Sequence, residues 1–163
     1  MDLARPVNGF TGPEQGFGYT IGVSVMAPHS RGTVRLAGAT PGAAPLLDPN
    51  YYGDPRDLDA VVAGLRLARR IGASAALGPW RAAEAVPGNP DLDLREYARR
   101  AVASYCHPVG TLAIGDVVDE SLRLRGIDGL WVADGSVMPN IPAGNTNATV
   151  YAIAERAAGL ITI

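Results

Sequence analysis

The stretch LWVADGS at residues 130–136 places four consecutive apolar residues directly before a turn. Continuous hydrophobicity, in contrast to alternation, is typical of a strand that is buried on both faces, as in a parallel sheet. Ligands of α/β proteins lie at the carboxyl ends of such strands, so Asp134 and Gly135 are candidate ligand contacts, with an ordinary turn as the alternative. A parallel strand needs neighbouring strands and crossover helices, and no other segment predicts a βαβ unit. We therefore interpret residues 130–133 as one strand of a sheet whose other strands lie elsewhere.

A helix is predicted directly downstream, from about Asn147 to Leu160. Apolar residues follow helical spacing along one side of it, and the residues before it, PAG at 142–144, favour a turn. Asn147 can act simply as a helix-capping residue. The alternative is that the free N–H groups and the positive dipole end of this helix face an electron-rich ligand.

The first two-thirds of the chain predict short strands and two helices. Residues 18–26 alternate between apolar and polar side chains and predict a half-buried strand, which could pair as a hairpin with a second strand at 31–36. The stretch 37–53 is rich in Gly, Pro and Ala and predicts a long loop. A helix is expected to begin at Asp54 and Pro55 and to end at Gly72, and a second one begins at Asp93.

Composition narrows the function classes. The 163 residues amount to about one domain, and 47% of them are apolar, which excludes a disordered or coiled-coil chain. The net charge of −2 argues against a nucleic-acid or anionic-membrane partner. No apolar run is long enough to span a bilayer, and the N-terminus does not resemble a signal peptide. We therefore expect a cytoplasmic protein.

Few residues could carry catalysis. His107 is followed by Pro108 and Gly110, which suit a histidine aimed into a site, although an isolated histidine is often structural. His29 is expected in a surface loop, and Cys106 is expected to be a buried, inert thiol. Two histidines and one cysteine without clustering predict no metal site. Neither a G-x-S-x-G elbow nor a correctly spaced G-x-G-x-x-G loop occurs.

Several spaced motifs together resemble one family. They are SRGTVRL at 30–36, DPNY at 48–51, HPVGT at 107–111, GIDGLWVADGSVMP at 126–139, IPAGNTNA at 141–148 and IAERAA at 153–158. In this order they resemble the C-terminal portion of the glucose–methanol–choline (GMC) oxidoreductases, flavoenzymes that oxidise alcohols. The resemblance extends over nearly the whole chain from about residue 18 and corresponds to about the last third of a family member.

The resemblance implies an α+β fold in which the chain divides into three parts. Residues 1–17 would be an arm or linker, and residues 18–125 would form the substrate-binding domain, an antiparallel sheet with flanking helices. Residues 126–163 would contribute a strand and a helix that complete a doubly wound FAD-binding domain. The N-terminal FAD-binding half is absent from this sequence, so we expect it on a separate chain or to have been removed from this one.

The resemblance also implies roles for single residues. His107 would be the general base that takes the proton of an alcohol substrate, which permits hydride transfer to flavin N5. Asn147 would donate a hydrogen bond to the developing alkoxide. The turn at Asp134 and Gly135 would lie along the ribityl–pyrophosphate part of FAD, and the backbone of Ala148 and Thr149 would meet the pyrimidine edge of the flavin.

Two other functions stay open from the sequence. The family contains hydroxynitrile lyases, in which an analogous histidine performs acid–base chemistry and the flavin is a bystander. The chain could also be a non-catalytic relic that serves as a binding or scaffolding module. Reduction of bound flavin by an alcohol distinguishes the oxidoreductase from both.

Overall fold

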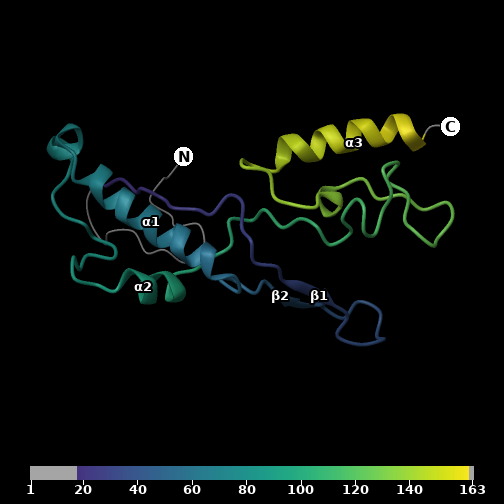
Figure 1. Ribbon diagram of the computed structural model, residues 1–163, viewed down its shortest axis with the longest axis horizontal. Helices are drawn as coiled ribbons and strands as arrows, with labels where there is room; N and C mark the ends of the chain where they lie inside the picture. Colours follow the sequence, from purple (N-terminus) through teal and green to yellow (C-terminus); the bar gives the residue numbers. More distant parts are fainter. Residues whose placement is uncertain (1–17, 162–163) are drawn as a thin grey trace. The chain divides into compact units, whose positions relative to one another are not determined.

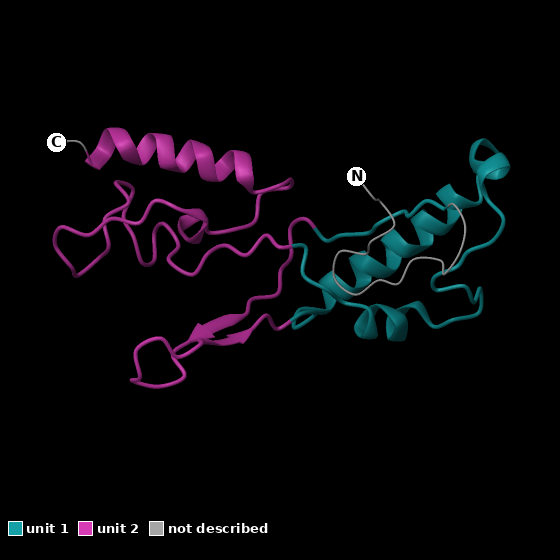
Figure 2. Cartoon of the chain, turned by 180° about the vertical axis from the view of Figure 1, so that it is seen from behind, with its two compact units in different colours: residues 1–25, 51–105 teal, residues 26–50, 106–163 magenta. Residues whose placement is uncertain are grey.

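The computed structural model describes residues 18–161, so the predicted arm at 1–17 lies outside the described residues. The chain divides into two compact units, one made of residues 1–25 and 51–105 and the other of residues 26–50 and 106–163 (Figure 2). The secondary structure is a mixture of helices and a two-stranded antiparallel sheet, which confirms the α+β class (Figure 1). The boundary that we expected at residue 125 stays a prediction.

The first unit is built on two helices, α1 (Pro55–Gly72) and α2 (Leu94–Arg100), with a 3₁₀-helix η1 (Ala75–Trp80) between them. Both helices begin as predicted. The Asp54 carboxylate accepts from the N–H of Arg56 at 2.9 Å, and the Asp93 carboxylate accepts from the N–H of Arg95 at 2.8 Å. Periodic apolar side chains meet between the helices and form a core of Leu58, Val62 and Ala98.

Residues 18–26 do not form the predicted strand. The alternation of burial is present, because Ile21, Val23 and Val25 are half-buried while Gly22 and Ser24 are exposed. No strand among the described residues pairs with this segment, so it stays extended and irregular. It lies against α1, where a Cβ added at Gly64 would stand 2.5 Å from Cγ1 of Val23. Alternation correctly indicated one buried face but wrongly predicted a hairpin.

The sheet belongs to the second unit and pairs β1 (Thr33–Arg35) with β2 (Leu46–Asp48), with Val34 opposite Leu47. The strand predicted at 31–36 is confirmed in part, and its partner comes from the stretch 37–53, which we predicted as loop. Gly32 lies against the backbone of Asp48 and Pro49, so a side chain at this position has no room. The pairing is short, and every residue of both strands is exposed.

The rest of the second unit is mostly irregular chain closed by η2 (Gly135–Val137) and α3 (Asn147–Ile161). The helix predicted from Asn147 is confirmed. Backbone hydrogen bonds from Leu112 N to Ser136 O (3.0 Å) and from Ile114 N to Val137 O (2.9 Å) hold the segment after His107 on η2. The buried core consists of Val118, Leu122, Val137 and Ala157.

Residues 130–133 do not form a parallel strand buried on both faces within this chain. Leu130 is exposed, and Trp131 to Ala133 are half-buried. The run pairs only briefly, through an antiparallel bridge between Trp131 and Arg123 that hydrogen bonds on either side extend. Because a single short neighbour is present, a doubly wound sheet is not observed, and the contribution of this run to one stays a prediction.

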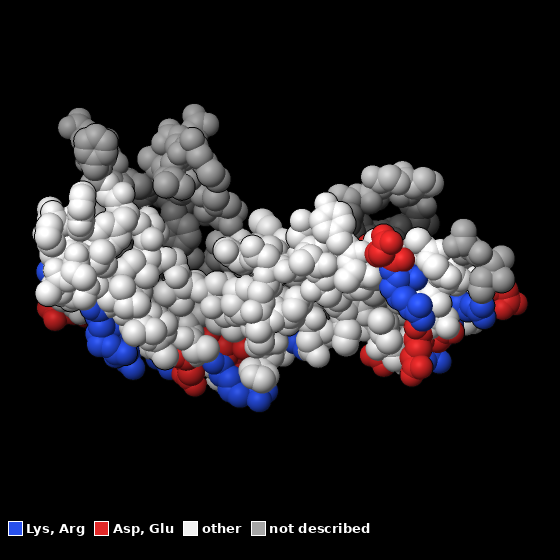
Figure 3. Space-filling model, turned by 90° about the horizontal axis from the view of Figure 1, so that it is seen from above, with Lys and Arg blue, Asp and Glu red and all other residues white. Residues whose placement is uncertain are grey.

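Charged side chains of both signs lie close together on the face drawn in Figure 3, without a large patch of one sign. Among the ion pairs of the described residues are Arg69 with Glu84 and Arg95 with Asp59. Within the part of the chain that the structure describes, no helix has the length and apolar character needed to cross a membrane.

The contact between Gly64 and Val23 predicts the outcome of a matched pair of substitutions. Gly159→Ala in α3 has open space around the new methyl group and should raise the free energy of unfolding by up to ~1 kcal/mol. For Gly64→Ala in α1 we expect a free energy of unfolding at least ~1 kcal/mol lower than that of Gly159→Ala. The new methyl group displaces Val23, and this cost cancels the gain in helix propensity. Urea denaturation followed by circular dichroism measures both. Equal stabilisation by the two variants would show that the segment 18–25 does not pack on α1.

Candidate active site

The loop that carries His107 has an unusual backbone. Cys106 adopts φ +61° and Gly110 adopts φ +88°, both in the left-handed region. A Cβ at Gly110 would lie 3.2 Å from the carbonyl oxygen of Met138, so glycine permits both the conformation and the close approach. Because Leu112 and Ile114 then bond to η2, the loop is fixed beside the Asp134–Gly135 turn.

The imidazole of His107 has two polar neighbours. Its Nδ1 lies 2.9 Å from the carbonyl oxygen of Cys106, and its Nε2 lies 3.2 Å from Oδ1 of Asn145. The ring is half-buried, and Cys106 is exposed, so the buried thiol expected from the sequence is wrong. A left-handed backbone at Cys106 presents this residue to the surface, which composition alone does not indicate.

Asn145 is a candidate site residue that the sequence analysis did not select. We selected Asn147, two positions later, whereas the side chain within hydrogen-bond distance of the His107 ring belongs to Asn145. Asn147 is the first residue of α3 and is exposed. Both asparagines stand in the same GNTN motif at 144–147, so the sequence contained the signal. The position of the helix start decides between them, and a boundary predicted from sequence is uncertain by this amount.

Asp134 organises the turn that precedes α3. Its carboxylate accepts from the hydroxyl of Ser136 at 2.5 Å and from the backbone N–H of Ser136 at 2.8 Å. These two bonds, the hydroxyl first, hold the pKa of Asp134 below its ordinary value, because they stabilise the charged form. The Asp134 carboxylate therefore caps the start of η2.

Gly135 lies where three parts of the second unit meet. A Cβ at this position would stand 3.5 Å from Cγ2 of Val150 in α3 and 3.9 Å from the carbonyl oxygen of Pro108. The backbone of η2 therefore lies next to both α3 and the His107 loop. Of the residues predicted for the site, the structure brings His107, Gly135 and the start of α3 into one region.

The start of α3 offers backbone donors. Val150 N donates to Thr146 O at 3.0 Å, which makes Thr146 the first acceptor of the helix. The N–H groups of Asn147, Ala148 and Thr149 belong to the first turn, where no acceptor within the helix is available. Asn147 and Ala148 are exposed, and Thr149 is half-buried. The helix dipole adds partial positive charge at the same place.

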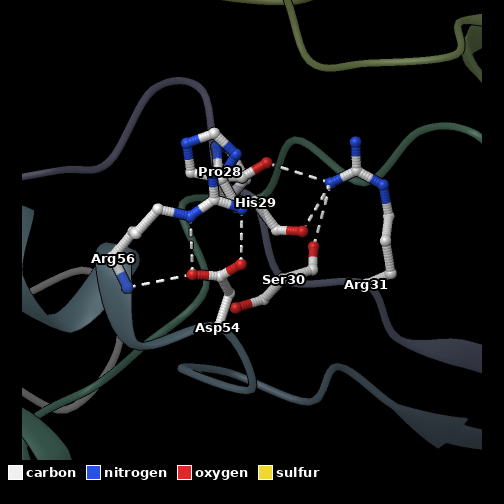
Figure 4. Close-up of polar contacts among 6 residues, drawn as sticks. All are labelled: Pro28, His29, Ser30, Arg31, Asp54 and Arg56. Carbon is white, nitrogen blue, oxygen red and sulfur yellow. Dashed lines mark hydrogen bonds and ion pairs between the residues drawn. The ribbon is translucent and has the colours of Figure 1, made fainter.

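Arg31 supports the chain that leads into α3. Its guanidinium donates to the carbonyl oxygens of residues 28–30 at 2.9–3.3 Å (Figure 4) and also bonds Oδ1 of Asn140. Asn50 in turn donates from Nδ2 to Arg31 O at 2.9 Å. These contacts give the SRG motif a structural role in the second unit. Figure 4 also shows the paired carboxylate and guanidinium of Asp54 and Arg56, which belong to the start of α1.

Among residues 18–161 no group of three or more His, Cys, Asp or Glu side chains could hold a metal ion. The side chains near the His107 ring offer acid–base and hydrogen-bonding chemistry. His107 can exchange a proton, and Asn145 and the first turn of α3 can orient and stabilise a polar ligand.

Comparison with known proteins identifies the family. The model of the GMC oxidoreductase family matches residues 28–154. The chain is 40% identical over 154 residues to an alcohol dehydrogenase [acceptor] of Pseudomonas putida, covering 90% of this chain and 28% of that protein. It is 41% identical over 172 residues to choline oxidase of Arthrobacter globiformis, covering 99% of this chain and 31% of that protein.

Solved structures support the same family assignment. The crystal structure of pyridoxine 4-oxidase from Mesorbium loti superimposes with a TM-score of 0.78 at 38% identity, over 82% of this chain and 28% of that chain. The chain thus spans about 30% of the length of the relatives it matches. The family and its structural neighbours are FAD-dependent flavoproteins, which confirms FAD as the cofactor of the family to which these residues point. The chain belongs to the GMC oxidoreductase family.

Proposed function

We propose that these 163 residues supply the catalytic side of an FAD-dependent oxidoreductase that acts on alcohol-type substrates. The observation that carries the proposal is the placement of the His107 ring beside Asn145, next to the start of α3. The relatives named alcohol dehydrogenase [acceptor], choline oxidase and pyridoxine 4-oxidase support an alcohol as the substrate class.

The residues at the start of α3 fit one edge of FAD. A flavin carries carbonyl oxygens on its pyrimidine edge, and the first-turn N–H groups of Ala148 and Thr149 are donors of matching chemistry, with Ala148 exposed. We assign Asp134 and Gly135 to the ribityl–pyrophosphate part, with contact through the backbone, because the Asp134 carboxylate is already bonded to Ser136. When bound there, FAD would supply the hydride acceptor for oxidation of the carbinol carbon.

The side chains then perform acid–base work. A neutral His107 takes the hydroxyl proton of the substrate, which makes loss of the hydride from the same carbon easier. Asn145 and Asn147 are the amides near this position that can donate to the alkoxide oxygen and hold the carbinol in line with the acceptor. The Asn145 side chain lies within hydrogen-bond distance of the His107 ring, whereas Asn147 is two residues later in the chain, at the first residue of α3.

The remainder of the FAD site has to come from outside these residues. The sequence contains no correctly spaced G-x-G-x-x-G loop, and the relatives carry their whole site on single chains about three times as long. We propose that a separate FAD-binding portion completes the site. The direct test combines this chain with the part of the pyridoxine 4-oxidase chain that it does not cover, and follows anaerobic bleaching of the flavin by a panel of alcohols. Bleaching supports the oxidoreductase. Bound flavin that no alcohol reduces contradicts it and favours a lyase or a non-catalytic relic.

His107→Ala tests the base. We expect the rate of flavin reduction in the combined protein to fall by ~10²–10⁴, which is the usual contribution of a positioned general base. Flavin content should stay near the wild-type value, because no FAD contact is assigned to the imidazole. His29→Ala is the matched control and should reduce flavin at the wild-type rate. A His107→Ala variant that reduces flavin as fast as wild type would refute the assignment.

Asn145→Ala and Asn147→Ala test which of the two amides donates a hydrogen bond to the alkoxide oxygen. The variant that removes the donor to the alkoxide should lose ~2–4 kcal/mol of transition-state stabilisation, as does deletion of one oxyanion donor. We expect a loss of this size for Asn147→Ala from the family resemblance, and a loss at least as large for Asn145→Ala from its contact with His107. Single-turnover flavin reduction measures both. Unchanged rates in both variants would mean that neither amide touches the reacting oxygen.

A further inference from the structure

Residues 18–25 run along α1 as an extended chain with one face on the helix (Figure 1). A Cβ added at Gly64 would stand 2.5 Å from Cγ1 of Val23. Further along the helix, a Cβ added at Gly72 would stand 3.7 Å from Cδ1 of Ile21. The residues that alternate with these two are exposed. This is the side-chain arrangement of a β-strand with one face covered.

The backbone of this segment is not used for pairing. Within residues 18–161, no backbone hydrogen bond involves residues 18–25, and β1 pairs with β2 rather than with them. The segment contains no proline, so each of its residues carries one N–H donor and one C=O acceptor. In an extended chain these groups point alternately to the two lateral edges. Both edges of the segment are therefore open to a further strand.

These edges lack the features with which proteins protect a free strand. Natural edge strands carry Lys, Pro or inward-pointing charges, because an unprotected edge pairs with another chain. The sequence GYTIGVSVM at 18–26 contains no charged residue and no proline. Four of its residues are β-branched and favour strands, namely Thr20, Ile21, Val23 and Val25. The segment therefore has the composition of a strand that is paired.

We propose that residues 19–25 are a docking strand, to which the separate FAD-binding portion adds an extended strand of its own. The inference rests on the proposed function, which requires such a portion, and it assigns a surface where that portion binds. The match to choline oxidase covers 99% of this chain and 31% of that protein, so the segment lies in the shared region and most of the relative lies outside it. Backbone pairing supplies affinity, and side chains already fixed on α1 reduce the entropic cost of ordering the strand.

Hydrogen exchange of backbone amides tests the proposal. In the chain alone, the amides of residues 19–25 should exchange at nearly the rate of unstructured chain. In the combined protein, at least every second amide of this segment should exchange ~100-fold more slowly or better. Unchanged exchange in the combined protein, or failure of the two portions to combine, overturns the proposal. Protection in the chain alone that grows with its concentration also overturns it, because the added strand then belongs to a second copy.

Proline substitutions identify the edge that is used. The N–H groups of Ser24 and Val25 point to opposite edges, and proline removes the donor at its own position. Each proline variant is compared with alanine at the same position, which keeps the N–H. In the chain alone, the two members of each pair should unfold at the same urea concentration, because neither N–H is bonded there. In the combined protein, Ser24→Pro, Val25→Pro or both should raise the dissociation constant ~10-fold or more above the alanine variant. Equal dissociation constants within both pairs contradict strand addition.

The outcome is distinguishable from failure of the proposed function. A combined protein with protected amides in the docking strand, whose flavin no alcohol reduces, refutes the oxidoreductase and leaves the docking strand intact. A combined protein that reduces flavin while residues 19–25 exchange as they do in the chain alone refutes the docking strand and leaves the oxidoreductase intact.

Discussion

Two backbone hydrogen bonds, Leu112 N to Ser136 O and Ile114 N to Val137 O, hold the candidate site together. They join the segment that follows His107 to η2, which lies more than twenty residues later in the chain. Val137, at the end of η2, is fully buried in the same core as Val118. Since buried backbone groups are costly to leave unpaired, this pairing is difficult to break locally. The histidine and the start of α3 are therefore held together by main chain.

Glycines and one arginine make this arrangement possible. Gly110 allows the His107 loop to approach the Met138 carbonyl, and Gly135 lies near Val150 of α3 without a side chain between them. The Arg31 guanidinium donates hydrogen bonds to three consecutive carbonyl oxygens and to Asn140, which lies in the segment between η2 and α3. A family motif that looks unrelated to catalysis in the sequence thus supports the connection that ends at Asn145.

Local signals were sufficient for some elements and insufficient for others. The helices α1 and α2 were predictable because their capping carboxylates and their apolar spacing lie within the elements themselves. The segment 18–26 was mispredicted as a strand, and residues 130–133 form only a bridge within this chain, because a strand depends on partners that are distant in sequence. For the same reason β2 was missed, as its short apolar run stands among Gly, Pro and Ala. His107 was recognisable from its motif, but the choice of Asn145 over Asn147 required the position of the helix start and the contact with the ring.

Hydrogen exchange of individual amides tests the central claim most directly. Leu112 N and Ile114 N lie in chain without regular secondary structure, and by that criterion alone they should exchange as fast as the exposed turn at 126–129. If their bonds to η2 organise the site, these two amides exchange far more slowly than that turn, at a rate similar to amides in the middle of α3. Exchange of Leu112 and Ile114 as fast as the turn would contradict the account, because His107 would then not be fixed beside α3.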